Sequence, residues 1–240
     1  MLERKLFMHQ NIPYSFNWNR FHFKEKLIQN ITIKQELNNL KMHFRKVSKG
    51  EIPNHLFNLR ALPRVSQFKI KGLKSAFIRS ISKQLIRSDK IRQLGPKSKL
   101  PSYAQKVYKN FKDNKIEGEP GHDPILKNIL IKDKNSLAIE IPIWKNKGNK
   151  VITGHIDLIQ VEANIIKVID YKPEGRFLVS LPQVAMYGIL LKSELDIKNL
   201  SCISFNKNKA WEYDPQILML EIKNYLISQG INYRPWENFI

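Results

Sequence analysis

The stretch TGHIDLIQVEANIIKVIDYKPEG, residues 153–175, predicts an antiparallel β-hairpin, because two β-rich apolar runs flank the short connection Glu-Ala-Asn. A loop centred at position 163.5 places Asp157 directly opposite Asp170 on the neighbouring strand. Like charges at directly opposed positions destabilise a sheet. Lys172 lies two residues after Asp170 and projects from the same face. The hairpin therefore gathers two carboxylates and an ammonium group at one point, which folding alone does not require.

Two interpretations of this charged cluster are open. A divalent cation such as Mg²⁺ or Mn²⁺ would relieve the repulsion, because hard cations bind carboxylate oxygens. The alternative is an exposed hairpin that carries an Asp/Lys salt-bridge cluster. On these three residues alone, the salt-bridged hairpin is the simpler interpretation.

Further motifs favour the metal site. The aspartate of GHID (residues 154–157) is followed by DYK (residues 170–172) on the next strand. A predicted helix then carries Gln183 and Tyr187 in a Q-x-x-x-Y pattern. In this order the motifs resemble those of the PD-(D/E)xK nuclease superfamily, and within it the RecB-like branch. The resemblance covers about residues 120–190.

The resemblance implies a metal-dependent active site. Asp157 and Asp170, with His122 and the backbone carbonyl of Tyr171, would hold one or two Mg²⁺ or Mn²⁺ ions. His122 lies 35 residues before Asp157, in GEPGHDPIL, and is expected just before the first turn of a helix. Lys172 would orient or help to deprotonate the attacking water and stabilise the charge that develops on the phosphate.

Four further residues are candidates for supporting roles. Gln183 and Tyr187 are four apart on one helix face, so they either reach the substrate strand or form a buried polar pair. His155 either contacts phosphate or metal, or supports the ligands from behind. Glu140 is either an additional carboxylate ligand from the neighbouring strand or a solvated strand position.

Residues 101–240 predict an α/β fold with a mixed β-sheet flanked by helices, the PD-(D/E)xK restriction-endonuclease-like core. The expected order is helix, three strands, helix, two strands and helix. Asp123 is the expected N-cap of the helix at Pro124, and Ser180 the N-cap of the helix that contains Pro182. The elements are expected at residues 102–113, 124–130, 136–144, 151–161, 165–172, 180–191, 200–206, 209–214 and 215–230. Gly95, Pro96 and Pro101 place the domain boundary at residues 94–101.

Residues 1–100 predict a basic, mainly helical region that binds nucleic acid. The net charge of the chain is +20, and this segment holds 22 Lys and Arg against 5 Asp and Glu. A surface adapted for solubility is the alternative. Helical spacing is found at residues 24–47 and 75–94, and the second helix carries its cations largely off the apolar stripe: Arg79, Lys83, Arg87 and Lys90. The aromatic residues between 14 and 23 either form a local core or stack on bases.

The composition also excludes several classes of protein. The single cysteine, Cys202, excludes an internal disulfide framework and a cysteine-ligated iron–sulfur cluster. No apolar run reaches the roughly 20 residues of a membrane span. The first residues lack the pattern of a signal peptide. A cytoplasmic protein is therefore expected, with an organellar presequence as the alternative.

The sequence thus predicts a Mg²⁺- or Mn²⁺-dependent deoxyribonuclease that acts on single- or double-stranded DNA in repair, recombination or replication. One alternative is a nucleic-acid-binding protein with a non-cleaving nuclease fold. Another is a structure-selective flap or junction endonuclease. The presence of both aspartates and the lysine favours an active enzyme.

Overall fold

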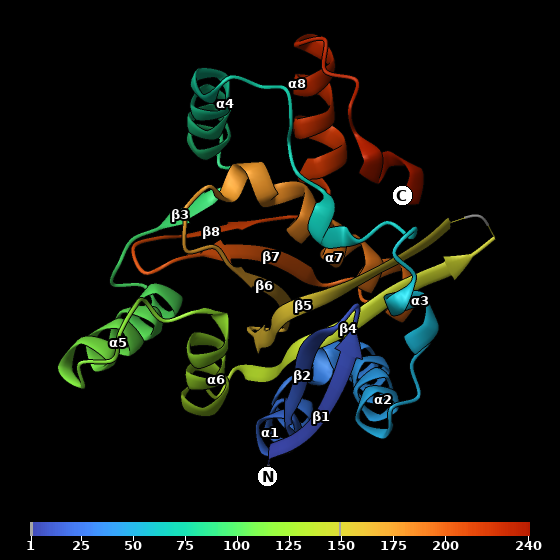
Figure 1. The fold of residues 1–240 in the computed structure, drawn as a ribbon, viewed down its shortest axis with the longest axis vertical. Coiled ribbons are helices and arrows are strands. Elements are labelled where there is room, and N and C mark those ends of the chain that lie inside the picture. Colours follow the sequence, from blue (N-terminus) through green and yellow to red (C-terminus); the bar gives the residue numbers. More distant parts are fainter. Residues whose placement is uncertain (1, 149) are drawn as a thin grey trace.

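An eight-stranded mixed sheet runs through the computed structural model, which describes residues 2–148 and 150–240 (Figure 1). The strand order is β1-β2-β4-β5-β6-β7-β8-β3. Neighbouring strands pair antiparallel, apart from the parallel pair β6 and β7. The strands are β1 (Leu2–His9), β2 (Ile12–Asn19), β3 (Arg92–Leu94), β4 (Ser136–Lys147), β5 (Lys150–Glu162), β6 (Ile165–Tyr171), β7 (Leu200–Phe205) and β8 (Ala210–Tyr213).

Helices cover both faces of the sheet, and each face has its own apolar core. On one face α5 and α6 pack against residues such as Leu158 and Ile169. On the other, α2 and α7 belong to a larger core that contains Ile166 and Val168. Burial on both faces explains why the central strands read as almost continuous apolar runs. The helices are α1 (Arg20–Gln29), α2 (Lys34–Lys49), α3 (Asn54–Asn58), α4 (Ser75–Arg87), α5 (Lys99–Asp113), α6 (His122–Lys132), α7 (Phe177–Leu195) and α8 (Lys223–Ser228). Short 3₁₀ turns occupy Ile31–Ile33, Val65–Gln67 and Pro235–Phe239, and a π-helical turn, Leu218–Ile222, precedes α8.

The expectation of a mixed α/β fold is confirmed, and so is the order of elements in residues 101–240. Three details were wrong. Helix α7 begins at Phe177, which stacks on Trp211 with ring centroids 4.3 Å apart, so Ser180 and Pro182 lie inside the helix and Ser180 is not its N-cap.

Helix α6 begins at His122, two residues earlier than expected. Asp123 is therefore in the first turn, where its carboxylate pairs with Lys127 at 2.7 Å, and is not the N-cap. Pro101 does not interrupt a helix but lies in the first turn of α5, where its missing N–H has no intrahelical partner to lose.

The N-terminal region contains a β-hairpin that the sequence analysis did not predict. Strands β1 and β2 are joined by Gln10 and Asn11, whose φ angles of 53° and 65° suit a tight hairpin turn. The helix expected at residues 24–47 is two helices, α1 and α2, and the one expected at 75–94 ends at Arg87, before β3.

The aromatic residues of the second strand and the helix after it form a local core. Phe16, Trp18 and Phe23 are buried, and the Trp18 and Phe23 rings meet edge to face. The local-core interpretation is confirmed for these three residues, whereas Phe21 is 57% exposed.

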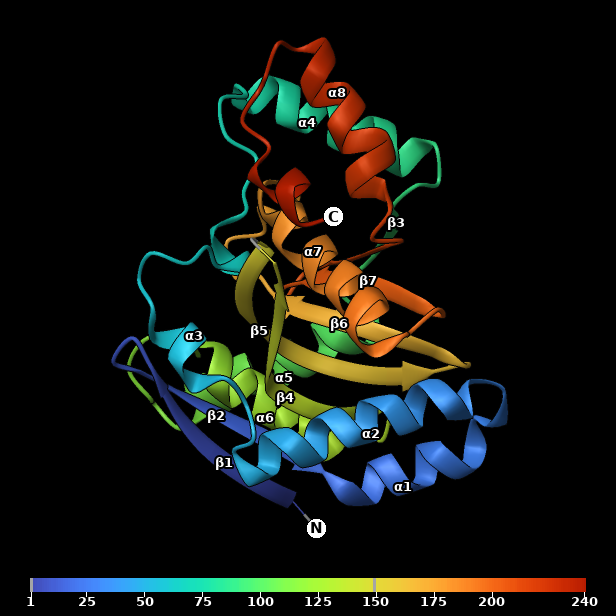
Figure 2. The ribbon, with the colours of Figure 1, turned by 90° about the vertical axis from the view of Figure 1, so that its right-hand side faces the viewer.

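The sheet contains strands from both sides of the boundary predicted at residues 94–101. Figure 2 shows β1 and β2 at one end of the sheet, to the left of α1 and α2, with α4 and α8 at the opposite end of the molecule. The division at this boundary stays a prediction. Within the part of the chain that the structure describes, no helix is long and apolar enough to cross a membrane.

Candidate active site

The register of the central hairpin places the two aspartates as the sequence predicted. Leu158 pairs with Ile169, and the connection is Ala163 and Asn164, with φ angles of 50° and 60°. A two-residue turn of this kind sets the offset between the strands. The same offset brings Asp157, in the interior of β5, opposite Asp170, near the end of β6.

The side chains around this position contact one another directly. Nζ of Lys172 lies 2.6 Å from Oδ2 of Asp170, whose side chain is 1% exposed. Oδ2 of Asp157 accepts a hydrogen bond from the backbone N–H of Tyr171 at 2.9 Å. Nδ1 of His122, from the first turn of α6, lies 3.3 Å from the same oxygen. The structure therefore brings together His122, Asp157, Asp170 and Lys172, as expected from the sequence.

Gln183 links these groups to α7. Its Oε1 accepts a hydrogen bond from Nζ of Lys172 at 3.1 Å, and its Nε2 donates to Oδ1 of Asp170 at 3.4 Å. The same Nε2 lies 3.5 Å from the hydroxyl of Tyr187. Tyr187 is 2% exposed and Gln183 is 7% exposed. The two therefore form a buried polar pair, one of the two alternatives, and the amide of Gln183 holds both Lys172 and Asp170.

The electrostatics of the site show an excess of buried negative charge. Burial, and then the charge of Asp157, raise the pKa of Asp170 to about 7. Burial and Asp157 likewise raise the pKa of Glu140 to about 8. Burial acts to lower the pKa of Lys172, but Asp170 and Asp157 together raise it. The hydrogen bond to Asp157 raises the pKa of His122 against the opposing effect of burial. A cation bound here would relieve this repulsion.

Glu140 occupies a strained position on β4. Its φ angle is 54°, in the left-handed region that residues other than glycine rarely adopt inside a strand. Ile139 packs in the core beneath α5 and α6, whereas Ile141 packs in the core on the opposite face. The left-handed conformation of Glu140 interrupts the regular alternation of side chains between the two faces of the sheet, at the position opposite Asp157 on β5. Strain of this kind concentrates at functional sites.

A pocket of about 440 Å³ opens beside Lys172, and its lining does not include Asp157, Asp170 or Glu140. It is lined by Ser66, Lys69, His122, Tyr171, Lys172, Pro173, Glu174, Arg176, Val179, Ser180 and Gln183. Lys69 and Arg176 were missed by the sequence analysis. Arg176 had a signal, since it is the basic residue in the connection between the DYK strand and the Q-x-x-x-Y helix. Lys69 lies about one hundred residues from the hairpin, and no motif around it in the sequence points to the site.

His155 is turned into an aromatic cluster. Its Nε2 lies 2.9 Å from Nδ1 of His9, and its ring stacks on Tyr14 with centroids 3.7 Å apart. Burial, with a smaller effect of His9, lowers the pKa of His155 well below its usual value. A neutral, buried imidazole fits the supporting role better than a contact to phosphate.

Of the cations predicted on the basic helix, Arg79, Lys83 and Arg87 lie on α4 and are exposed, whereas Lys90 lies beyond the end of the helix. Arg79 and Lys83 line a groove beside the candidate site, whereas Arg87 lies outside that lining. The structure therefore separates residues that the sequence analysis had grouped together.

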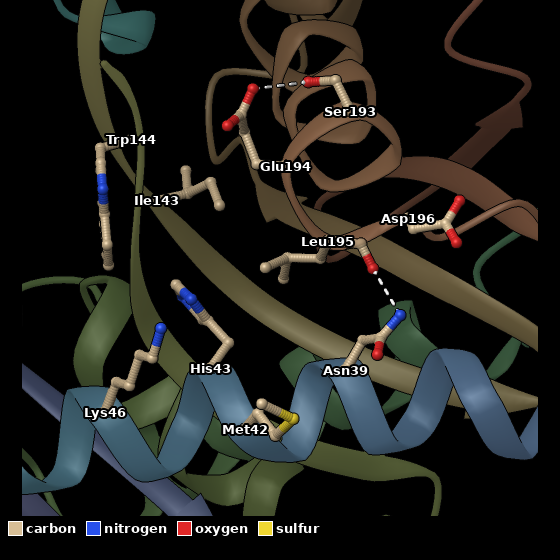
Figure 3. Close-up of a pocket in the computed structure, with 10 residues that line it drawn as sticks. All are labelled: Asn39, Met42, His43, Lys46, Ile143, Trp144, Ser193, Glu194, Leu195 and Asp196. Carbon is tan, nitrogen blue, oxygen red and sulfur yellow. Dashed lines mark hydrogen bonds between the residues drawn. The ribbon is translucent and has the colours of Figure 1, made fainter. Parts of the chain in front are cut away.

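A second pocket, of about 420 Å³, lies between α2 and the end of α7 (Figure 3). Asn39 donates a hydrogen bond to the carbonyl of Leu195 across it, at 3.0 Å. His43 is buried at its edge, beside Trp144. Burial lowers the pKa of His43 to about 4. This pocket between α2 and α7 shares no lining residue with the pocket beside Lys172.

Metal ligation rests on few side chains. Within residues 2–148 and 150–240, no three His, Cys, Asp or Glu side chains are grouped so that they could hold a metal ion by themselves. Mg²⁺ is commonly bound through one or two carboxylates and keeps several waters. The donors that fit such an ion here are Asp157 and Asp170.

No family model, curated protein or solved structure matches the chain.

Proposed function

We propose that the chain is a metal-dependent deoxyribonuclease of the PD-(D/E)xK type that hydrolyses phosphodiester bonds. The observation that carries the proposal is the meeting of Asp157, Asp170 and Lys172 at one end of the hairpin. Two opposed carboxylates destabilise a sheet, and here Lys172 contacts the buried Asp170 while His122 contacts the partly exposed Asp157. The high positive charge of the chain supports a polyanionic substrate.

In this proposal Asp157 and Asp170, with His122 and the carbonyl of Tyr171, hold Mg²⁺ or Mn²⁺. When bound, such an ion would lower the pKa of a water molecule and polarise the scissile phosphate. Glu140 is a further candidate ligand, because burial and the charge of Asp157 raise the pKa of its carboxyl to about 8, and a neighbouring cation would lower that pKa. The substrate is single- or double-stranded DNA, and repair, recombination or replication is the proposed setting.

Lys172 is the group that the protein itself brings to the reaction. Its ammonium is 15% exposed at the wall of the pocket, and its high pKa keeps it charged at neutral pH. Gln183 fixes its direction through the 3.1 Å hydrogen bond. A fixed ammonium stabilises the charge that gathers on the phosphate oxygens.

Cleavage of labelled single- and double-stranded DNA with Mg²⁺ or Mn²⁺ tests the proposal. We expect cleavage by the wild type and none by Asp157→Ala or Lys172→Ala. Lys192→Ala is the matched control, because Lys192 also lies near an aspartate, 3.8 Å from Asp214, but away from the pocket. Cleavage by all four proteins alike would show that the activity comes from elsewhere.

The alternative functions give different results in the same assay. A protein that binds the DNA but leaves every substrate intact would be a nucleic-acid-binding protein with a non-cleaving fold. Cleavage restricted to flapped or branched substrates would identify a structure-selective endonuclease.

A further inference from the structure

A second hollow adjoins the candidate active site. It has a volume of about 550 Å³ and lies between α4 and the segment Gly175–Val179, and we call it the α4 groove. Arg176 and Val179 line both the groove and the pocket beside Lys172. The two hollows are therefore neighbours that share part of one wall.

The lining of the α4 groove is strongly basic. Four of its residues are cations, namely Arg79, Lys83, Arg176 and Lys209, and no Asp or Glu lines it. Serine hydroxyls and the amide of Gln93 supply further hydrogen-bonding groups. Ile78 and Ile86 form an apolar strip along the same wall. Cations beside apolar surface suit the phosphates and sugars of a polynucleotide.

The four groove cations lack protein counter-charges. In the described residues 2–148 and 150–240, none of them has a carboxylate oxygen within 4.0 Å of its side-chain nitrogens. Around the groove the pattern is mixed: Lys90 lies 3.4 Å from Glu221 and Arg92 pairs with Glu212, whereas Arg87 on the same helix also has no such partner among the described residues. The four groove cations are therefore available to an external anion, and their place in the groove is what distinguishes them from Arg87.

We propose that the α4 groove binds the phosphodiester backbone of the substrate strand on one side of the scissile phosphate. Its place beside the cleavage site rests on the proposed function, whereas its binding of a polyanion does not.

Helix α4 is suited to this role because its anchoring and its charged face are separate. Ile81 and Leu85 are buried, and the hydroxyl of Tyr225 donates to the carbonyl of Phe77 at 3.4 Å. Arg79 and Lys83 are exposed. Figures 1 and 2 show α4 beside α8, with the start of α7 below it. Alanine substitutions at Arg79 and Lys83 should therefore remove charge without loosening the helix.

Binding measurements without divalent metal test the groove independently of cleavage. Fluorescence anisotropy with labelled single-stranded and blunt duplex oligonucleotides would be followed between about 50 and about 200 mM salt. We expect Arg79→Ala/Lys83→Ala to weaken binding and to reduce the slope of log K against log salt by about 0.7 per lost contact for a single strand, or about 0.9 for a duplex. Arg87→Ala is the matched control on the same helix, and we expect it to bind as the wild type does.

The outcomes separate the groove from the nuclease proposal. If Arg79→Ala/Lys83→Ala and Arg176→Ala bind both oligonucleotides with the affinity and slope of the wild type, the groove proposal is wrong, whatever the cleavage assay shows. It is also wrong if Arg87→Ala weakens binding as much as Arg79→Ala/Lys83→Ala does. Selective loss of binding in a protein that never cleaves would support the groove and refute the nuclease. If the variants lose more affinity for one of the two oligonucleotides, single-stranded or duplex, that oligonucleotide is the form of DNA that the groove binds.

Discussion

Gly154 and Tyr187 provide a sharp test of how the candidate site is assembled. A Cβ added at Gly154 would lie 2.6 Å from Cε1 of Tyr187, and 3.1 Å from Cβ of Val65. Ordinary carbon contacts are about 3.5–4.0 Å, so the ring must move by about 1 Å. Tyr187 contacts Gln183, which holds Lys172, so the displacement reaches the site. This contact gives a physical reason for the glycine of GHID to accompany the tyrosine of Q-x-x-x-Y.

The expected magnitude follows from two opposing effects. Alanine in a strand interior is normally more stable than glycine by about 0.5–1 kcal/mol. Overpacking of a dense core costs about 1–3 kcal/mol. For Gly154→Ala we therefore expect a loss of about 1–2 kcal/mol in the free energy of unfolding, with a fall in Tm of about 2–4 °C per kcal/mol. A misplacement of about 1 Å near the site should lower kcat/KM by about 100-fold.

Urea unfolding and the DNA cleavage assay measure the two effects. Gly95→Ala is the matched control, because a Cβ there would meet nothing within 4 Å. In a Tyr187→Leu background the ring is absent, so Gly154→Ala should lose most of its cost, apart from what Val65 contributes. If the substitution costs the same in both backgrounds, or leaves the wild type unaffected, the reasoning is refuted.

Three further predictions concern stability. Burial lowers the pKa of His43 to about 4, so the unfolded chain binds a proton at this residue at a higher pH than the folded chain does. The free energy of unfolding should therefore drop by about 3 kcal/mol as the pH falls from about 6.5 to about 4. In urea unfolding, His43→Gln should lose less stability over this pH range than the wild type, and equal losses would contradict the prediction. Glu36 accepts hydrogen bonds from the backbone N–H groups of Lys198 and Asn199 at 2.9 and 3.0 Å. Glu36→Ala should therefore lower the free energy of unfolding, measured in urea, by about 1–3 kcal/mol. The control is Glu51→Ala at an exposed position, which should lower it by less than about 0.5 kcal/mol. Mg²⁺ at about ten times its Kd should add about 1.4 kcal/mol to the free energy of unfolding of the wild type and nothing to that of Asp170→Asn, and an equal gain in both would place the ion elsewhere.

Much of the central sheet was predictable because its determinants are local. The apolar runs mark the strands, and a two-residue turn sets the register between β5 and β6. That register brings Asp157 and Asp170 together and places Lys172 beside them. The element boundaries were less predictable, as α7 shows, because Phe177 extends the helix by packing on Trp211, which lies in a distant strand.

The sequence by itself determined the charged hairpin and its register, since spacing along two neighbouring strands decides which side chains face each other. Only the tertiary structure decided which other groups reach that point. The bridge of Gln183, the left-handed backbone of Glu140 and the approach of Arg79 to Arg176 each depend on how separate elements pack. Such contacts form when segments that are far apart in the chain bury apolar surface against one another. The spacing of residues within one segment therefore cannot predict them.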